Sequence, residues 1–124
     1  MTDVPAARRM LIVEDEQKMR QLLTDFFTAR GFAVTATFSG EEALAMLATQ
    51  PVEVVLLDIL LPGMSGMEVL RRMKRQQPSV KVVIVSALDQ DHLRMEARRY
   101  GACEYITKPF ELNTATWAAV FAPV

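Results

Sequence analysis

The chain contains one cysteine, Cys103, and one histidine, His92, among its 124 residues. A single cysteine has no partner for an intramolecular disulfide, so the sequence is not typical of a disulfide-stabilised secreted domain and suits a reducing cytoplasm. We therefore interpret Cys103 as a small buried side chain. His92 lies in a polar stretch with helical spacing and is expected to face solvent, so no motif for phosphotransfer through histidine is present.

The sequence also lacks an excess of either charge and any long apolar run. Fourteen Lys and Arg residues are balanced by fifteen Asp and Glu residues, a formal charge of -1. Without a net positive field, we expect this segment to bind neither nucleic acid nor an anionic membrane directly. The apolar run near the start, Met10–Val13, is too short for a signal peptide or a membrane span, so nothing directs the chain out of the cytoplasm.

The length fits one compact domain, which we assign to residues 1–124. Residues 1–8 carry no periodicity, so a frayed start is expected. Residues 114–124 carry no charge and hold more apolar side chains than one buried stripe needs; they include Trp117, Val120 and Phe121. This last segment is either a protein-docking surface or a terminus cut from a longer chain, and the sequence leaves both interpretations open.

Four short apolar runs each end at a polar residue. Val54–Leu57 leads to Asp58, and the others are Met10–Val13 before Glu14 and Asp15, Val82–Val85 before Ser86, and Tyr105–Thr107 before Lys108. Such runs are typical of strands covered on both faces, as in a parallel sheet flanked by helices. Because ligands of open parallel sheets bind outside the carboxyl ends of the strands, these five polar side chains are candidates for one site.

Segments with helical spacing separate the strands. The predicted strands are Arg9–Val13, Phe32–Thr37, Val54–Leu57, a fourth that ends at Ser86 and Ala87, and Cys103–Thr107. The predicted helices begin after Glu16, at Ser39, at Ser65, at Asp89 and at Leu112, and end at Gly31, before Pro51, before Pro78, at Gly101 and at Ala122. Five alternations of strand and helix predict a doubly wound α/β sandwich.

Four segments together resemble the receiver domain of two-component response regulators. They are Leu-Ile-Val-Glu-Asp-Glu at 11–16, Leu-Leu-Asp-Ile-Leu-Leu-Pro-Gly-Met-Ser-Gly-Met-Glu at 56–68, Val-Ser-Ala at 85–87 and Ile-Thr-Lys-Pro-Phe at 106–110. The resemblance covers the whole chain and depends on the order and spacing of all four segments. It implies a flavodoxin-like fold with a five-stranded parallel sheet in the order 2-1-3-4-5 and helices on both faces.

The resemblance implies that Asp58 is the nucleophile that accepts a phosphoryl group. It further implies that Asp15, Asp58 and the backbone carbonyl of Leu60 bind Mg²⁺, with Glu14 acting through water and Mn²⁺ as a substitute metal. The residues agree with this, because carboxylates at the ends of neighbouring strands repel one another and a hard divalent cation with oxygen ligands relieves the repulsion.

Other residues acquire roles by the same resemblance. Lys108 and Ser86 would bind the transferred phosphoryl group, and Pro109 would follow a cis peptide bond. Tyr105 would move into the space left when Ser86 shifts toward the phosphoryl group, which is the family's usual switch. Leu88 would control the access of water.

The partners implied are a sensor histidine kinase or a phosphotransfer protein. An output domain or partner protein would bind the surface made by the helix beginning near Asp89, the strand Cys103–Thr107 and the last helix, and homodimerisation is left open. The chain departs from many receivers in having Glu14 with Asp15 in place of two aspartates, and Ser86 in place of threonine, but both changes keep the functional groups.

Three other interpretations are weighed against this one. A phosphatase of the haloacid dehalogenase type would need a second acid two residues after the nucleophile, where this chain has Leu60. A flavodoxin-like flavin binder would need a phosphate-binding loop after the first strand, where this chain has three acids. A degenerate receiver that serves only as a docking module would not need the five polar residues.

Overall fold

The computed structural model describes residues 7–123 and contains a five-stranded parallel sheet in the order β2-β1-β3-β4-β5. The strands are β1 (Arg9–Val13), β2 (Ala33–Thr37), β3 (Val54–Leu57), β4 (Lys81–Ser86) and β5 (Glu104–Thr107). The helices are α1 (Gln17–Thr28), α2 (Gly40–Thr49), α3 (Gly66–Gln76), α4 (Asp91–Arg99) and α5 (Ala118–Phe121). The predicted α/β fold and strand order are confirmed; residues 1–6 of the start expected to be frayed lie outside the described residues.

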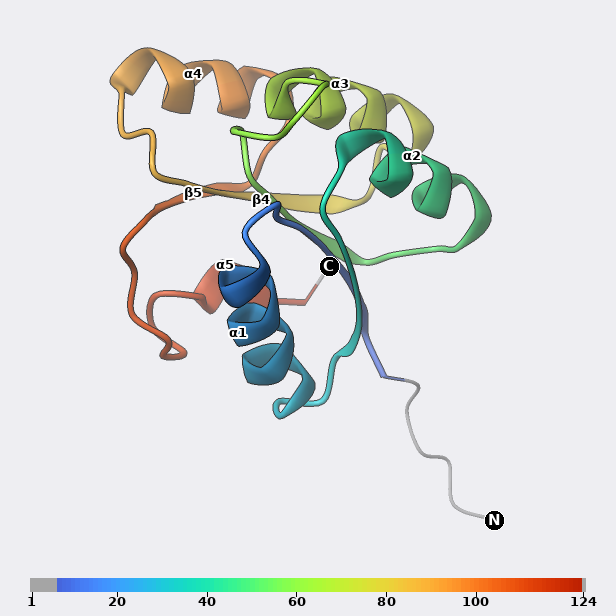
Figure 1. The fold of residues 1–124 in the computed structure, drawn as a ribbon, viewed down its shortest axis with the longest axis vertical. Helices are drawn as coiled ribbons and strands as arrows, with labels where there is room; N and C mark the ends of the chain where they lie inside the picture. Colours follow the sequence, from blue (N-terminus) through green and yellow to red (C-terminus); the bar gives the residue numbers. More distant parts are fainter. Residues whose placement is uncertain (1–6, 124) are drawn as a thin grey trace.

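Helices cover both faces of the sheet, as Figure 1 shows, with α2, α3 and α4 on one face and α1 and α5 on the other. Successive residues of β1 point to opposite sides, so Leu11 and Val13 join the core under α2 and α3, whereas Met10 and Ile12 join the core that includes α1. All four of these side chains are at most 1% exposed. Burial on both faces explains why residues 10–13 of β1 are all apolar, and the same holds for β3, which is buried throughout.

The register of the sheet aligns the polar residues that follow the strands. Val13 of β1 pairs with Leu57 of β3, so the next residues, Glu14 and Asp58, emerge together at the carboxyl edge of the sheet. On the other side of β3, Ser86 pairs with Thr107, which precedes Lys108. The fold therefore brings the polar residues that end or follow β1, β3, β4 and β5 to the same edge, whereas Tyr105 lies within β5.

The ends of several helices agree with the sequence, and three differ. Gly31 and Gly101 have φ of 94° and 102°, so each supplies the left-handed residue that follows a helix. The hydroxyl of Ser39 accepts a hydrogen bond from the backbone of Glu42, which caps α2 as predicted. The prediction that Asp89 caps α4 is wrong: Gln90 is the capping residue, and the Asp89 carboxylate instead binds the Arg94 guanidinium.

The second difference is at α3, where Ser65 caps the helix through a different donor. Its hydroxyl accepts from the backbone of Met67 rather than from that of Glu68. Glu68, the other member of the predicted capping box, pairs instead with Arg71 and Arg72 one turn along the helix. The side chain of Glu68 therefore stabilises the exposed face of α3 rather than its first backbone amide.

The last segment contradicts the prediction of a long helix from Leu112 to Ala122. Only Ala118–Phe121 is helical, and the residues before it form turns in which the indole of Trp117 donates to the carbonyl of Glu111 and the side chain of Asn113 accepts from the backbone N–H of Thr116. Trp117 and Val120 are fully buried, and the indole packs edge-on against the rings of Phe27 and Phe110. These apolar side chains complete the core, so they do not form the docking surface that the sequence left open.

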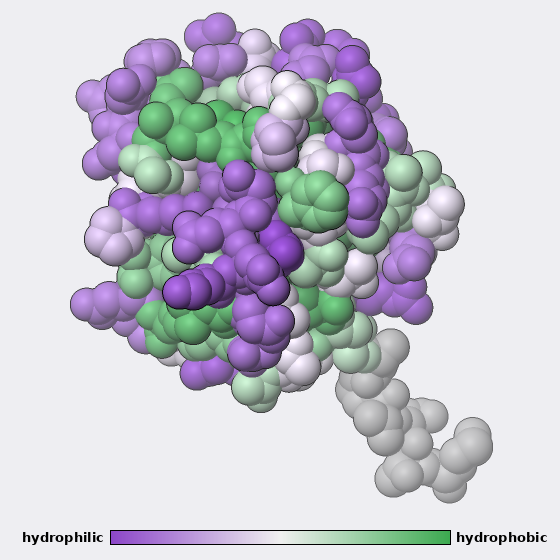
Figure 2. Space-filling model, viewed as in Figure 1, coloured by the Kyte–Doolittle hydropathy of each residue, from purple (hydrophilic) through white to green (hydrophobic). Residues whose placement is uncertain are grey.

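The prediction that Cys103 is buried is also wrong. Cys103 is exposed because it precedes β5, the edge strand of the sheet, where no further strand covers it. His92 is exposed, as predicted. Large hydrophobic side chains that are exposed are few in the described part of the chain, namely Leu22, Phe38, Leu60 and Met95. Figure 2 shows the resulting mixture of hydrophilic and hydrophobic areas on one face.

Two basic side chains hold the end of α5 against the amino edge of the sheet. The Arg8 guanidinium donates to the carbonyls of Phe121 and Ala122, and the Lys81 ammonium donates to those of Ala119 and Ala122. Cations at the C-terminus of a helix satisfy its free carbonyls. Within residues 7–123, no helix combines the length and the apolar character that crossing a bilayer requires.

Trp117→Ala is expected to lower the free energy of unfolding by about 3–5 kcal/mol, because it leaves a large cavity among aromatic rings. Urea denaturation followed by circular dichroism measures the loss, and Trp117→Phe, which refills most of the cavity, serves as the matched control with a smaller loss. If Trp117 belonged to a docking surface instead, its replacement by alanine would leave stability nearly unchanged.

Candidate functional site

Asp58 is the first residue after β3 and is only 4% exposed. Its backbone N–H donates to the carbonyl of Val13, which fixes the residue against β1. One carboxylate oxygen, Oδ1, accepts from the backbone N–H of Leu60 at 3.0 Å, and the other, Oδ2, accepts from Nζ of Lys108 at 2.8 Å. Both oxygens are thus oriented by donors that a negatively charged Asp58 favours.

Gly66, the first residue of α3, allows that helix to begin directly behind Asp58. A Cβ atom at this position would clash with the carbonyl oxygen of Asp58 and with Cα of Ile59. The backbone N–H of Gly66 donates to the carbonyl of Ile59 at 2.9 Å, which closes the loop after β3. Glycine is therefore required here by close packing of backbone on backbone.

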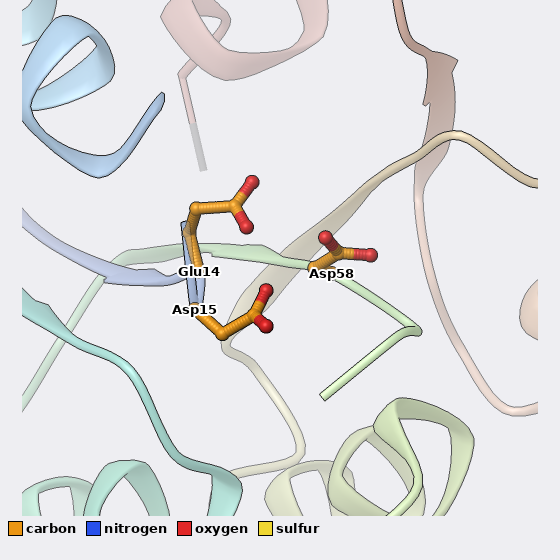
Figure 3. A group of neighbouring side chains, drawn as sticks. All are labelled: Glu14, Asp15 and Asp58. Atoms are coloured by element: carbon orange, nitrogen blue, oxygen red, sulfur yellow. The ribbon is translucent and has the colours of Figure 1, made fainter. Parts of the chain in front are cut away.

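Two further acids lie beside Asp58 and come from the end of β1. Figure 3 shows Glu14 and Asp15 on the strand next to the one that carries Asp58. One carboxylate oxygen from each of the three residues lies within 4.8 Å of the others. Glu14 is 2% exposed, whereas Asp15 is exposed and lies at the solvent side of the cluster.

The donor set fits a hard divalent cation. Its three side chains offer only carboxylate oxygens, the ligands that Mg²⁺ prefers. The exposed Asp15 leaves room for the waters that Mg²⁺ retains when it binds a protein. Lys108 supplies one positive charge against three negative ones, so a dication would balance the two that remain.

Lys108 joins the acids from the end of β5. Its ammonium donates to Oε1 of Glu14 as well as to Oδ2 of Asp58, at 2.5 and 2.8 Å. Burial alone would lower the pKa of Lys108, but the hydrogen bonds to Asp58 and Glu14 outweigh burial, so the pKa is raised and the lysine stays charged. The following peptide bond, Lys108–Pro109, is cis, and the backbone N–H of Lys108 donates to the carbonyl of Ser86 at 2.8 Å.

Glu14 is the acid most affected by its surroundings. Burial raises the pKa of Glu14 above its usual value of 4.5, although hydrogen bonds from Lys108 and from the backbone of Glu16 oppose the shift. The repulsion from Asp58 adds to the rise. Glu14 is therefore strained electrostatically when ionised, which a bound cation would relieve.

Ser86 and Tyr105 form a separate group next to the acids. The hydroxyl of Ser86 is fully buried and accepts from the backbone N–H of Leu88 at 3.2 Å. The phenol of Tyr105 donates to the carbonyl of the same Leu88, and the Arg94 guanidinium lies 4.8 Å above the tyrosine ring. Burial raises the pKa of Tyr105, so its hydroxyl stays protonated as a donor.

The structure brings Glu14, Asp15, Asp58 and Lys108 into direct proximity. Ser86 is linked to them through the backbone of Lys108, and Leu60 binds Asp58 through its N–H while its side chain is 51% exposed. Tyr105 is connected to this group through the carbonyl of Leu88, which accepts a hydrogen bond from its phenol.

Sequence reasoning missed two arginines that contact this region. Arg20 of α1 donates to the carbonyls of Glu14 and Asp15, and Arg94 of α4 stacks on Tyr105. The contacts of Arg20 with backbone carbonyls and of Arg94 with the ring of Tyr105 leave no signal in the sequence.

The family of the chain follows from comparison with known proteins. The family model described as the response regulator receiver domain matches residues 10–119. This span includes all four polar strand ends described above, and the chain belongs to this family. It is thus a response regulator receiver domain of a two-component system. Receiver domains are generally Mg²⁺-dependent, and the family implies interaction with a histidine kinase or a phosphotransfer partner.

Two curated relatives are similar over most of the chain. The uncharacterized transcriptional regulatory protein YkoG of Bacillus subtilis is 39% identical over 104 residues, which cover 84% of this chain and 46% of YkoG. The response regulator SaeR of Staphylococcus aureus is 35% identical over 101 residues, covering 82% of this chain and 44% of SaeR. The chain therefore spans less than half the length of these relatives.

Solved structures agree on the fold. A CheY-like response regulator receiver domain protein of Methanospirillum hungatei has a TM-score of 0.87 at 24% identity, with 92% of this chain and 91% of that chain covered. A chain of the CheX–CheY–BeF3–Mg²⁺ complex of Borrelia burgdorferi has a TM-score of 0.84 at 30% identity, with 94% and 90% covered. The flavodoxin-like arrangement is therefore shared with CheY-like receivers.

The raised pKa of Glu14 predicts how stability changes with pH when no metal is added. Because the folded state binds this proton more tightly than the unfolded state, the stabilising contribution is fully present below about pH 4.5 and is lost as pH rises through the folded pKa. Urea unfolding between pH 4 and 8 in EDTA, for wild type and Glu14→Gln, should therefore show wild type losing stability relative to the variant as pH rises. A parallel pH dependence in the two proteins would contradict this assignment.

Proposed function

We propose that this domain accepts a phosphoryl group from a phosphohistidine of a histidine kinase or phosphotransfer protein onto Asp58. The observation that carries the proposal is the Lys108 ammonium, bound to both Asp58 and Glu14 beside the exposed Asp15. A partly buried lysine shared by two buried carboxylates is a costly arrangement for stability alone, and clusters of this kind mark functional sites.

The proposed reaction is a displacement at phosphorus. A carboxylate oxygen of Asp58 forms a bond to phosphorus, the bond from phosphorus to the histidine nitrogen breaks, and the nitrogen keeps the electron pair. The product is an acyl phosphate on Asp58 and a free histidine on the donor. The backbone N–H of Leu60 holds Oδ1 of Asp58, and so helps to fix the orientation of the carboxylate.

Lys108 and Ser86 are proposed to bind the transferred group. The ammonium already contacts Oδ2 of Asp58, so it lies where charge on phosphoryl oxygens would develop. The Ser86 hydroxyl accepts from the backbone N–H of Leu88 in this structure, and as a donor it would bind a phosphoryl oxygen.

Asp15, Asp58 and the carbonyl of Leu60 are proposed to hold Mg²⁺, with Glu14 contributing through water and Mn²⁺ as an alternative metal. When bound, the metal neutralises charge on the acids and on the phosphoryl oxygens. The chain itself supplies the oxygen donors and the strand geometry that keeps them together.

The switch proposed for the phosphorylated state starts from Ser86. Movement of its hydroxyl toward a phosphoryl group would break the hydrogen bond from Leu88, whose carbonyl holds the phenol of Tyr105. Tyr105 would then be free to turn inward, which would alter the surface of α4, β5 and α5. Two or three charge-assisted hydrogen bonds supply the few kcal/mol that such a population shift needs.

The proposal extends to the setting in which the domain works. Residues 1–124 are taken as one receiver domain that acts in the cytoplasm and controls an output domain or partner protein through α4, β5 and α5. A haloacid dehalogenase-like phosphatase is disfavoured because Leu60 stands where that class needs an acid, and a docking module without chemistry would have no use for the Lys108 contacts.

Incubation with Mg²⁺ and acetyl phosphate, a small acyl phosphate, tests the acceptor. Intact-mass spectrometry should detect one added phosphoryl group on the wild type and none on Asp58→Asn, because the substitution removes the carboxylate proposed as the nucleophile. Asp25→Asn, which removes an exposed acid of α1, is the matched control and should be labelled like the wild type. Rapid turnover of a phosphomonoester would instead support a phosphatase.

Lys108→Ala tests the role of the lysine in switching. The variant should bind Mg²⁺ at least as tightly as the wild type, because removing a cation leaves the acids more negative. It should still accept a phosphoryl group, but hydrogen exchange of residues 86–105 should no longer change on phosphorylation. Lys18→Ala, an exposed lysine of α1, is the control. A wild-type exchange response in Lys108→Ala would count against the proposed role.

A further inference from the structure

Arg20 lies in the first turn of α1, directly below the loop that carries the acids. Its Nη1 donates to the backbone carbonyl of Glu14 at 2.9 Å and to that of Asp15 at 3.3 Å. A single guanidinium nitrogen therefore binds two successive peptide groups. Its backbone N–H also closes the first turn of α1 on the carbonyl of Glu16, so the side chain projects from a fixed point.

Other restraints on Asp15 are absent among the described residues. The Asp15 carboxylate receives no hydrogen bond from residues 7–123, whereas Glu14 and Asp58 are each held by Lys108 and by a backbone N–H. The start of α1 lacks a side-chain cap, and its first turn contains no acid. The direction of the Asp15 side chain thus depends on its backbone, and Arg20 is the side chain that holds this backbone.

We infer that Arg20 is a positioning residue for divalent-cation binding at the acidic cluster. By fixing the peptide groups of Glu14 and Asp15, Arg20 sets the direction in which the Asp15 carboxylate leaves the loop. The inference rests on the Mg²⁺ site proposed above and deepens it. Groups that orient metal ligands without touching the metal change affinity by about 10–100-fold when they are removed.

Two effects of Arg20 have opposite signs and can be separated. If orientation dominates, the loss of the guanidinium weakens Mg²⁺ binding. If its positive charge dominates, the loss relieves repulsion of the cation and tightens binding. Arg20→Lys keeps the charge but replaces the planar guanidinium by a single rotatable ammonium, and Arg20→Met removes both properties.

Calorimetric titration of the whole chain with Mg²⁺ alone distinguishes these cases. We expect both Arg20→Lys and Arg20→Met to bind Mg²⁺ about tenfold more weakly than the wild type. Arg30→Lys is the matched control, since Arg30 lies on the same helix, donates to the carbonyl of Phe26 and stacks on its ring, away from the acids. The control should bind Mg²⁺ like the wild type, and the unfolding midpoints of all variants in EDTA should agree.

A second measurement separates positioning from a structural role. The rate of labelling by acetyl phosphate should be slow for Arg20→Lys at limiting Mg²⁺ and should return to the wild-type rate when Mg²⁺ saturates the site. A rate that stays low at saturation, wild-type Mg²⁺ affinity in Arg20→Lys, or tighter binding in Arg20→Met would each overturn the inference while leaving Asp58 as the acceptor. A wild type that binds no Mg²⁺ at millimolar concentration would overturn both this inference and the proposed site.

Discussion

The site depends on one ammonium group shared by two buried carboxylates. Lys108 bonds to Glu14 and Asp58 at once, and without it two acids would be buried together with no counter-charge. An unpaired buried charge is far more costly than the pair itself contributes, so the lysine makes the acidic cluster compatible with a folded domain. The same contact holds the two carboxylates close together, where they can act on a cation or a phosphoryl group.

The sheet makes that contact possible. β1, β3 and β5 are not neighbours in sequence, yet their parallel register brings Glu14, Asp58 and Lys108 to one edge. β1 and β3 are packed on both faces by apolar side chains, so their carboxyl ends have little freedom to move. The positions of the polar side chains are thus fixed mainly by the apolar packing of the strands that carry them. The loops at the carboxyl edge add local hydrogen bonds.

Most of this arrangement could be predicted from the sequence. Uninterrupted apolar runs that stop at Glu14, Asp58 and Ser86 already indicate buried parallel strands and a shared edge. The predictions that failed concern side chains with more than one available partner. The Asp89 carboxylate binds Arg94 rather than the start of α4, and the indole of Trp117 bonds to the carbonyl of Glu111 in a segment predicted to be helical. The contacts of Arg20 could not be predicted from the sequence either, because they involve backbone carbonyl groups, which every residue has.

The hydrogen bonds from Lys81 to the end of α5 mean that β4 contacts α5 at its start and carries Ser86 at its end. β4 begins at Lys81, which binds the carbonyls of Ala119 and Ala122, and ends at Ser86. The two residues are therefore joined by one extended strand. An extended strand does not stretch, and five steps of about 3.3 Å separate its two ends. A displacement of β4 along its axis would therefore move Ser86 at the carboxyl edge of the sheet and, at the same time, move Lys81 and the end of α5 at the opposite edge.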